Sequence, residues 1–247
     1  MNRHLAIAAV VGAVSTLAAC NGDVDAQWDL DHDRIVAIQA SKPGLLPGET
    51  AELTGLVGHK GARTEVRSPL VVIVPDLPNR SPTPAGLKAT VHTDGGRWFV
   101  TAPGEAVLDD ARTELGLALT DPVPVTLGVS YGETLNAITT VRFGVDAQNP
   151  ALDMPSLDGV VLAADAAPHL GALVDARLEI AIPTTIDVNW LTSVGTMHDF
   201  DLAKAYIRVE KGDPIDGELA VVLRDRLGGV AWEVWPLTAD DPATVAK

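Results

Sequence analysis

Three carboxylates at alternate positions are the clearest candidate for metal chemistry in this sequence. Asp29, Asp31 and Asp33 lie in one acidic stretch near the start of the chain. Alternate carboxylates can converge on one Ca²⁺ ion if the loop that carries them curls. An EF-hand loop would need glycine and glutamate where this chain has Arg34 and Ala40. We therefore expect a solvated acidic tether, and a calcium-dependent adhesion module is the alternative.

A second pattern, Gly128-Val-Ser-Tyr-Gly132, matches the nucleophile elbow of serine hydrolases. An elbow requires a strand that turns sharply into a helix, which exposes the serine beneath oxyanion donors. Here the strand-like run leads through Gly132 and Glu133 into another strand-like run. We expect Ser130 to serve hairpin packing, and a Ser130-dependent envelope hydrolase is the lesser alternative. The histidines are scattered without metal-binding spacing, so the sequence predicts no enzyme, no catalytic residue and no cofactor other than calcium in the adhesion alternative.

The single cysteine, Cys20, offers a different chemistry, which is acylation of its thiol. Arg3, an apolar run over 5–14 and small residues before Cys20 are typical of a secretory signal peptide. A transmembrane anchor would need about 20 apolar residues, and Gly12 and polar residues interrupt this run. The run Leu17-Ala-Ala-Cys20 resembles the lipobox of bacterial lipoproteins. That resemblance implies that a helical signal peptide, 1–19, is removed and that Cys20 carries palmitate and other acyl chains in the membrane.

The net charge limits the class of partner, and the residue after the cysteine indicates the location. The chain has a formal charge of −15, and the leader carries Arg3 but no acidic residue, so the mature chain is more acidic still. Such a surface disfavours nucleic acid as a partner. By the same resemblance, Asn21 in place of aspartate implies the outer membrane of the bacterial cell envelope.

The order of strand-like runs predicts an all-β protein with two immunoglobulin-like β-sandwich domains. Short apolar or alternating runs recur between Pro/Gly turns along the chain, as in sandwiches. Helical spacing over 104–118 predicts one short helix in the first domain. One elongated sandwich is the alternative. The predicted parts are a tether over 20–33, an N-terminal sandwich over 34–148, a C-terminal sandwich over 149–237 that begins after a hinge, and a polar tail over 238–247.

The tryptophans are the candidate contact residues. Trp190 lies in the middle of a strand-like run, and we expect it in the core. Trp232 and Trp235 fall on opposite faces of one strand, so one is expected inside and the other outside. Trp28, in the tether, has no evident core to enter and would dock on the first domain or insert at the lipid interface. We name Trp28 and Trp235 as candidate contacts.

Several phrases resemble those of myxobacterial-type envelope lipoproteins with immunoglobulin-like modules. The resemblance spans most of the mature chain and implies β-sandwiches at the cell surface or in the periplasm. It implies no substrate and no catalytic residue, so we expect a lipid-anchored binding or structural module with an envelope protein or glycan as its partner. The phrases are Arg34–Ile38, Leu46–Leu53, Asn149-Pro150, Trp190–Gly195 and Val222–Trp232.

Processing at Cys20 is directly testable by mass spectrometry of the protein from its native host. We expect a mature chain that begins at Cys20 and carries the mass of attached acyl chains. An intact, unlipidated amino-terminal segment in a freely cytosolic product would contradict the prediction.

Overall fold

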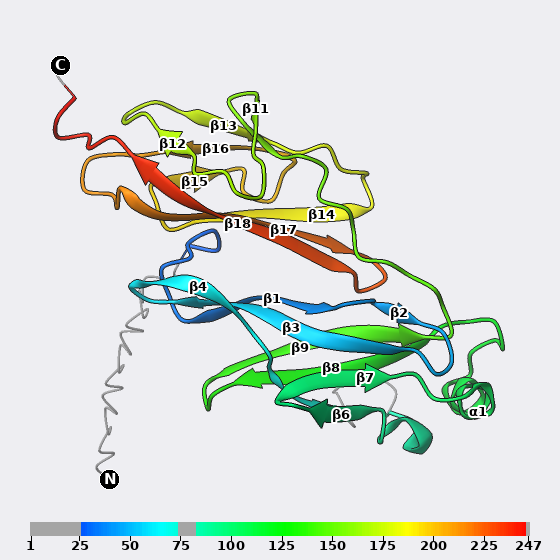
Figure 1. Cartoon of the computed structure of the whole chain (residues 1–247). Coiled ribbons are helices and arrows are strands. Elements are labelled where there is room, and N and C mark those ends of the chain that lie inside the picture. Colours follow the sequence, from blue (N-terminus) through cyan, green and yellow to red (C-terminus); the bar gives the residue numbers. More distant parts are fainter. Residues whose placement is uncertain (1–25, 74–82, 246–247) are drawn as a thin grey trace, which may run out of the picture.

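The computed structural model describes residues 26–73 and 83–245. Within them the chain forms four antiparallel or mixed sheets and one α-helix, arranged as two lobes, one above the other in Figure 1. No helix among these residues is long and apolar enough to span a bilayer. The predicted signal peptide, Cys20 and the first part of the predicted tether lie outside the described residues.

The first sandwich joins a sheet of order β1-β3-β7-β6, with β4 added to β3, to a sheet of order β2-β9-β8-β5. Helix α1 (Glu105–Leu115) and the 3-10 turn η1 (Ala85–Leu87) lie at one end of it. Its strands are β1 (Arg34–Ala40), β2 (Gly44–Leu45), β3 (Thr50–His59), β4 (Ala62–Arg67), β5 (Leu70–Ile73), β6 (Val91–Asp94), β7 (Arg97–Thr101), β8 (Val123–Tyr131) and β9 (Leu135–Phe143).

The second sandwich joins a sheet of order β12-β18-β17-β14 to a sheet of order β11-β10-β13-β16-β15. Its strands are β10 (Ser156–Leu157), β11 (Val160–Val161), β12 (His169–Leu170), β13 (Ala176–Glu179), β14 (Ile186–Thr192), β15 (Thr196–His198), β16 (Lys204–Arg208), β17 (Asp216–Asp225) and β18 (Val230–Ala239).

Both sandwiches have the same strand order, which is that of immunoglobulin domains. In order across each sheet, β1-β3-β7-β6 and β10-β13-β16-β15 correspond to strands A, B, E and D, and β9-β8-β5 and β18-β17-β14 to strands G, F and C. A short strand pairs in parallel with the last strand in each case, β2 with β9 and β12 with β18. The prediction of an all-β, immunoglobulin-like fold is therefore confirmed, and the strand plan repeats although the sequence does not.

Trp190 occupies the core position that the sequence predicts. It lies on β14, which is strand C of the second sandwich, and it is fully buried. Its indole N–H donates a hydrogen bond of 3.1 Å to the carbonyl oxygen of Leu202. A buried tryptophan on strand C is a hallmark of immunoglobulin domains.

The predicted helix is confirmed as α1, between two glycines. Gly104 precedes its first turn, and Gly116 ends it in the left-handed region at φ 68°. Arg112 points into the fold with a side chain 3% exposed, and it pairs with Glu105 at 2.7 Å and Asp109 at 2.8 Å. Along the chain, the helix connects β7 (strand E) to β8 (strand F).

The chain is already folded before Arg34, which corrects the prediction of a tether up to residue 33. Trp28 packs against the core of the second sandwich, and Leu30 is 2% exposed. The N–H of Leu30 donates to Thr192 O at 3.0 Å, and the N–H of Thr192 donates to Trp28 O at 2.9 Å. Residues 28–30 therefore extend the sheet beyond β14, because their apolar side chains have a surface to cover there.

The two sandwiches pack on each other through a third hydrophobic cluster, separate from their two cores. We call this set the interface cluster. β1 and β3 contribute to it from the first sandwich, and the outer face of β14, β17 and β18 contributes from the second (Figure 1). Its buried members are Leu30, Val36, Ala37, Leu56, Leu191, Ala220, Val222 and Val230, with Trp232 and Val234 partly buried beside them.

Asn149 lies between the sandwiches where the sequence predicts a hinge. Its amide nitrogen donates to Ala40 O at 2.8 Å, and its amide oxygen accepts from Val230 N at 3.0 Å. One side chain thus bonds to backbone on both sides. The connection at residues 149–150 is thus held by hydrogen bonds to both sandwiches, which corrects the expectation of a hinge.

The polar tail begins later than predicted. β18 runs to Ala239, which is 8% exposed and belongs to the core of the second sandwich. Ala239 N donates to Ile215 O at 2.8 Å. The strand continues because this backbone hydrogen bond and the pairing with β12 still hold it.

A charge placed in the interface cluster should uncouple the sandwiches. We expect Val222→Asp, at a fully buried position, to cost several kcal/mol because a carboxylate there has no partner. Small-angle X-ray scattering should show a larger radius of gyration, and calorimetry should show two transitions instead of one.

Leu56→Asp, on the opposite side of the interface and 1% exposed, should act in the same way. The matched control is Val72→Asp, at a position 53% exposed on the first sandwich. A compact, single-transition Val222→Asp protein would contradict this account of the interface.

Candidate functional site between the sandwiches

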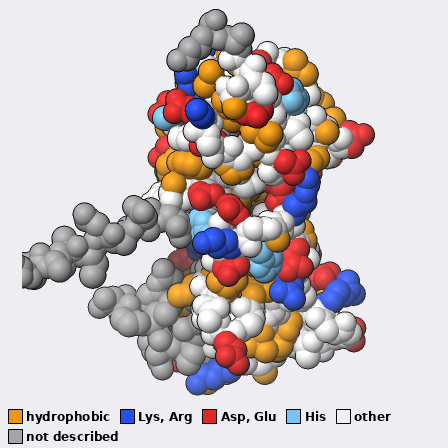
Figure 2. Space-filling model, turned by 90° about the vertical axis from the view of Figure 1, so that its left-hand side faces the viewer, with side chains coloured by type: hydrophobic (Ala, Val, Ile, Leu, Met, Phe, Trp, Pro, Cys, Tyr) orange, Lys and Arg blue, Asp and Glu red, His pale blue; other side chains and the backbone are white. Residues whose placement is uncertain are grey.

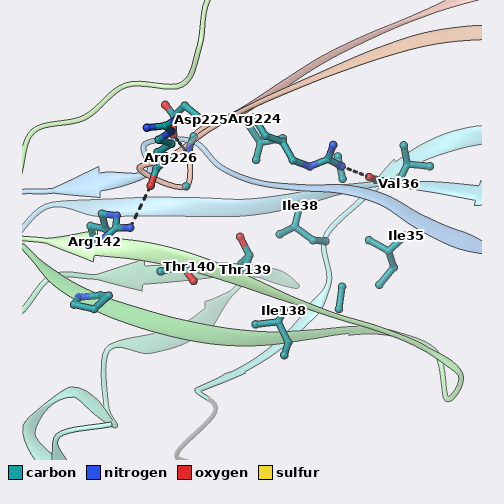
Figure 3. Close-up of a pocket in the computed structure, with 16 residues that line it drawn as sticks. Ile35, Val36, Ile38, Ile138, Thr139, Thr140, Arg142, Arg224, Asp225 and Arg226 are labelled. Atoms are coloured by element: carbon teal, nitrogen blue, oxygen red, sulfur yellow. Dashed lines mark hydrogen bonds between the residues drawn. The ribbon is translucent and has the colours of Figure 1, made fainter. Parts of the chain in front are cut away.

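A groove of about 740 Å³ lies where β1, β9 and the β17–β18 hairpin meet (Figure 3). We call it the inter-sandwich groove. Its three sides are Ile35–Ile38 of β1, Ala137–Thr140 with Arg142 of β9, and residues 224–226 and 228–230 of the hairpin. Its volume falls in the range of small-molecule and peptide pockets. The groove depends on both sandwiches, because the hairpin belongs to the second and the two strands to the first.

The hairpin is held in shape by Asp225. One carboxylate oxygen accepts hydrogen bonds from Leu227 N at 2.8 Å and from Gly229 N at 2.7 Å. Gly228 has φ +95°, and a Cβ atom there would collide with the carbonyl oxygen of Thr140. The tip therefore needs glycine to lie against β9.

Three arginines border the groove: Arg142 and Arg226 lie at the hairpin tip, and the guanidinium of Arg224 reaches Val36 of β1 farther along the groove (Figure 3). Arg142 donates to Leu227 O and to Arg226 O, each at 3.2 Å. Arg224 donates to Asn189 Oδ1 at 2.7 Å and to Val36 O at 2.8 Å. Arg226 is exposed. These guanidinium groups bind neutral oxygens, and no carboxylate of the described residues forms a salt bridge with any of them.

Burial disfavours the charged form of two arginines beside the groove. Desolvation lowers the pKa of Arg224 and the neighbouring charge of Arg34 lowers it further, whereas the carboxylate of Asp187 opposes both effects. Desolvation also lowers the pKa of Arg34, and Asp29 opposes that effect. Both side chains also line a smaller pocket of about 340 Å³ beside Asn189 and Phe200. A positive region is thus built into a protein whose acidic side chains are spread over both lobes in Figure 2.

The three acids proposed for calcium do not converge on one point. Asp29 Oδ1 accepts a hydrogen bond from Asp31 N at 2.8 Å. Asp31 accepts from Gly61 N at 2.6 Å and Asp33 from Lys60 N at 3.2 Å. Asp31 and Asp33 thus bind N–H groups of the β3–β4 turn, and Asp29 binds an N–H group within its own segment. Over the described ranges, no three His, Cys, Asp or Glu side chains are grouped as a metal site.

The tryptophan contacts differ from those the sequence suggests. Trp235 is 1% exposed, and its indole N–H donates to Ala163 O at 2.8 Å. It therefore belongs to the core, which corrects its proposal as a contact residue. Trp28 docks on the second sandwich, which corrects docking on the first. Trp232 lies on the opposite face of β18 from Trp235 and packs against the interface cluster.

Ser130 lies inside a regular strand and lacks the elbow geometry. It lies on β8, between β5 and β9 in the sheet, where it pairs with Leu70 of β5 and Asn136 of β9. The turn that follows contains Gly132 at φ 64° and leads to β9. No helix follows the serine, so the arrangement provides no oxyanion donors from a helix start.

The sequence reasoning missed Arg142, Arg224 and Arg226, which carry the positive charge of the groove. A signal for two of them was present in the turn Arg224-Asp-Arg-Leu-Gly-Gly229, which is a basic hairpin tip in an acidic protein. Arg142 lies 82 positions from Arg224 along the chain, and no local pattern connects the two.

The comparisons with known proteins identify no family for this chain. No protein-family model matches the chain, and no curated protein is significantly similar to it. Among solved structures, the tandem Ig repeats of Dlar match at 12% identity and TM-score 0.29, over 85% of this chain and 99% of that one. Two tandem V-type regions of VCBP3, a chitin-binding protein, match at 9% identity and TM-score 0.32, over 83% and 99%.

Extracellular domains 3–5 of Drosophila OTK match at 12% identity and TM-score 0.25, over 83% of this chain and 63% of that fragment. This chain thus spans just under two thirds of the OTK fragment. At such identities and TM-scores, we base the fold on the strand order alone and take no activity from the matched proteins.

The placement of the acids predicts that calcium leaves the stability unchanged. We expect the same thermal midpoint in millimolar calcium and in chelator, because Asp29, Asp31 and Asp33 already accept backbone hydrogen bonds. Asp31→Asn, which keeps an oxygen for Gly61 N, should retain the midpoint, whereas Asp31→Ala should lose about 1 kcal/mol. A calcium-dependent rise that Asp31→Asn abolishes would contradict this and favour the adhesion module.

Proposed function

We propose that the chain is a non-enzymatic binding module of the bacterial envelope, anchored by lipid on Cys20, which holds a protein partner in the inter-sandwich groove. The observation that carries the proposal is the groove itself, built from both sandwiches and bordered by three arginines that form no salt bridge with a carboxylate of the described residues. Asn21 after the lipidated residue supports an outer-membrane location.

The coupling of the two sandwiches suits a binding role. The interface cluster and Asn149 hold the β17–β18 hairpin against β1, and Arg142 of β9 binds the carbonyl oxygens of Arg226 and Leu227 at the hairpin tip. A groove held in this way needs little ordering when a ligand binds, so less of the interaction energy is lost to conformational entropy. Exposed apolar side chains beside it, such as Ile138 at 56% exposure, offer contact area.

Site-specific photo-crosslinking in intact cells tests this proposal. A photoreactive phenylalanine analogue in place of Leu227, which is 43% exposed at the hairpin tip, should yield one dominant crosslinked protein. The same analogue in place of Val160, which is 69% exposed on the opposite sheet of the second sandwich, is the matched control. No adduct from position 227, or equal adducts from both positions, would overturn the groove as the binding site.

A further inference from the structure

Strand β9 has one edge that is not paired with another described strand over most of its length. β8 pairs with β9 along its whole length, from Leu135 to Phe143. On the other side, β2 pairs only with Arg142 and Phe143. The edge of residues 135–141 is therefore open, and open edges are templates for pairing with another chain.

The direction of the backbone groups shows which of them face the open edge. Arg142 N donates to Pro43 O at 2.9 Å, on the side away from β8. Because strand backbones alternate with a period of two, Asn136, Ile138 and Thr140 point to the same side. Thr140 O lies against Gly228. No backbone hydrogen bond from the described residues reaches Asn136 or Ile138 on this side.

The inter-sandwich groove runs along this edge. Residues 137–140 of β9 line one of its sides, and Ile35–Ile38 of β1 line another. β1 is the less available template, because Arg224 already binds the carbonyl oxygen of Val36 (Figure 3). The free donors and acceptors in the groove are thus those of β9.

The charge at the end of the groove selects the kind of strand that fits. Arg142 and Arg226 lie at the hairpin end, and neither forms a salt bridge with a carboxylate of the described residues. Arginine binds carboxylates strongly, often through two parallel hydrogen bonds. Exposed Ile138, in the middle of the open edge, favours apolar or β-branched residues next to the acidic ones.

We propose that an extended segment of a partner protein, with acidic residues at one end, adds to β9 as a further strand and places its carboxylates at Arg142 and Arg226. The proposal deepens the proposed function, on which it rests, by naming the mode of binding. Backbone hydrogen bonds to Asn136 and Ile138 give affinity, and the two arginines give direction and specificity.

Selection from a phage-displayed library of random ten-residue peptides against the full-length chain in detergent is the test. We expect enrichment of sequences with alternating β-branched residues and an acidic end. Fluorescence anisotropy of an enriched peptide should show at least tenfold weaker binding to Ile138→Pro, which removes the outward N–H without breaking a bond to β8. Ile138→Ala keeps that N–H and is the matched control, with less than threefold loss expected.

Arg226→Glu should weaken the acidic peptide by about tenfold and leave binding of an uncharged variant of the peptide unchanged. Hydrogen exchange should show protection at Asn136 and Ile138 only when the peptide is bound. Failure to enrich such peptides, or equal binding to the Ile138→Pro and wild-type proteins, would overturn the proposal.

Two other occupants of the edge would appear in the same experiments. Protection of Ile138 N–H without peptide in a monomer would mean that the chain covers its own edge. Dimerisation in sedimentation equilibrium that Ile138→Pro abolishes would mean that a second copy does so. Either result overturns the proposal.

Two outcomes distinguish a failure of the proposed function from a failure of strand addition. If the adduct from position 227 persists in cells that carry Ile138→Pro, the groove binds a partner but strand addition is wrong. If position 227 gives no adduct in either background while peptides still bind, strand addition stands and the cellular role of the groove is wrong.

Discussion

The sheet formed by β14, β17 and β18 is buried on both faces, and the rest of the architecture depends on this double burial. One face forms the core of the second sandwich with Trp190 and Trp235, and the other forms the interface cluster with β1 and β3. β17 accordingly shows six consecutive buried residues, Glu218–Leu223, where a strand exposed on one face would alternate. The two lobes therefore pack face to face, and the last hairpin lies beside the first sandwich.

The groove is a consequence of that packing. The β17–β18 hairpin projects beyond the interface cluster and meets β9, with Gly228 close against Thr140. Arg142 and Arg224 then bind carbonyl and amide oxygens of the hairpin tip, β1 and β14, and neither forms a salt bridge with a carboxylate of the described residues. Binding sites between rigid elements keep their shape at low entropic cost, which connects the interface to the proposed role in recognition.

The fold class, the helix and the longest strands follow from sequence because their signals are local. Alternation in β8, helical spacing before Gly116 and the central Trp190 each depend on residues near one another. The sequence analysis did not predict the shortest strands, β2, β10, β12 and β15, because two or three residues carry no periodic signal. β4 escaped because its side chains are mostly exposed, and its pairing with β3 holds it in place.

The sites that the sequence missed depend on contacts between distant segments. Composition and local pattern determined the sandwich class, the acidic surface and the predicted acylation of Cys20. Only the tertiary structure decided that Trp235 lies inside, that Trp28 covers the second sandwich and that Asp29, Asp31 and Asp33 bind backbone N–H groups. The physical reason is that burial and hydrogen bonding depend on what a face meets in space. The packing of sheet on sheet and the docking of residues 28–33 on the two sandwiches decide these outcomes, and neither has a local signature in the chain.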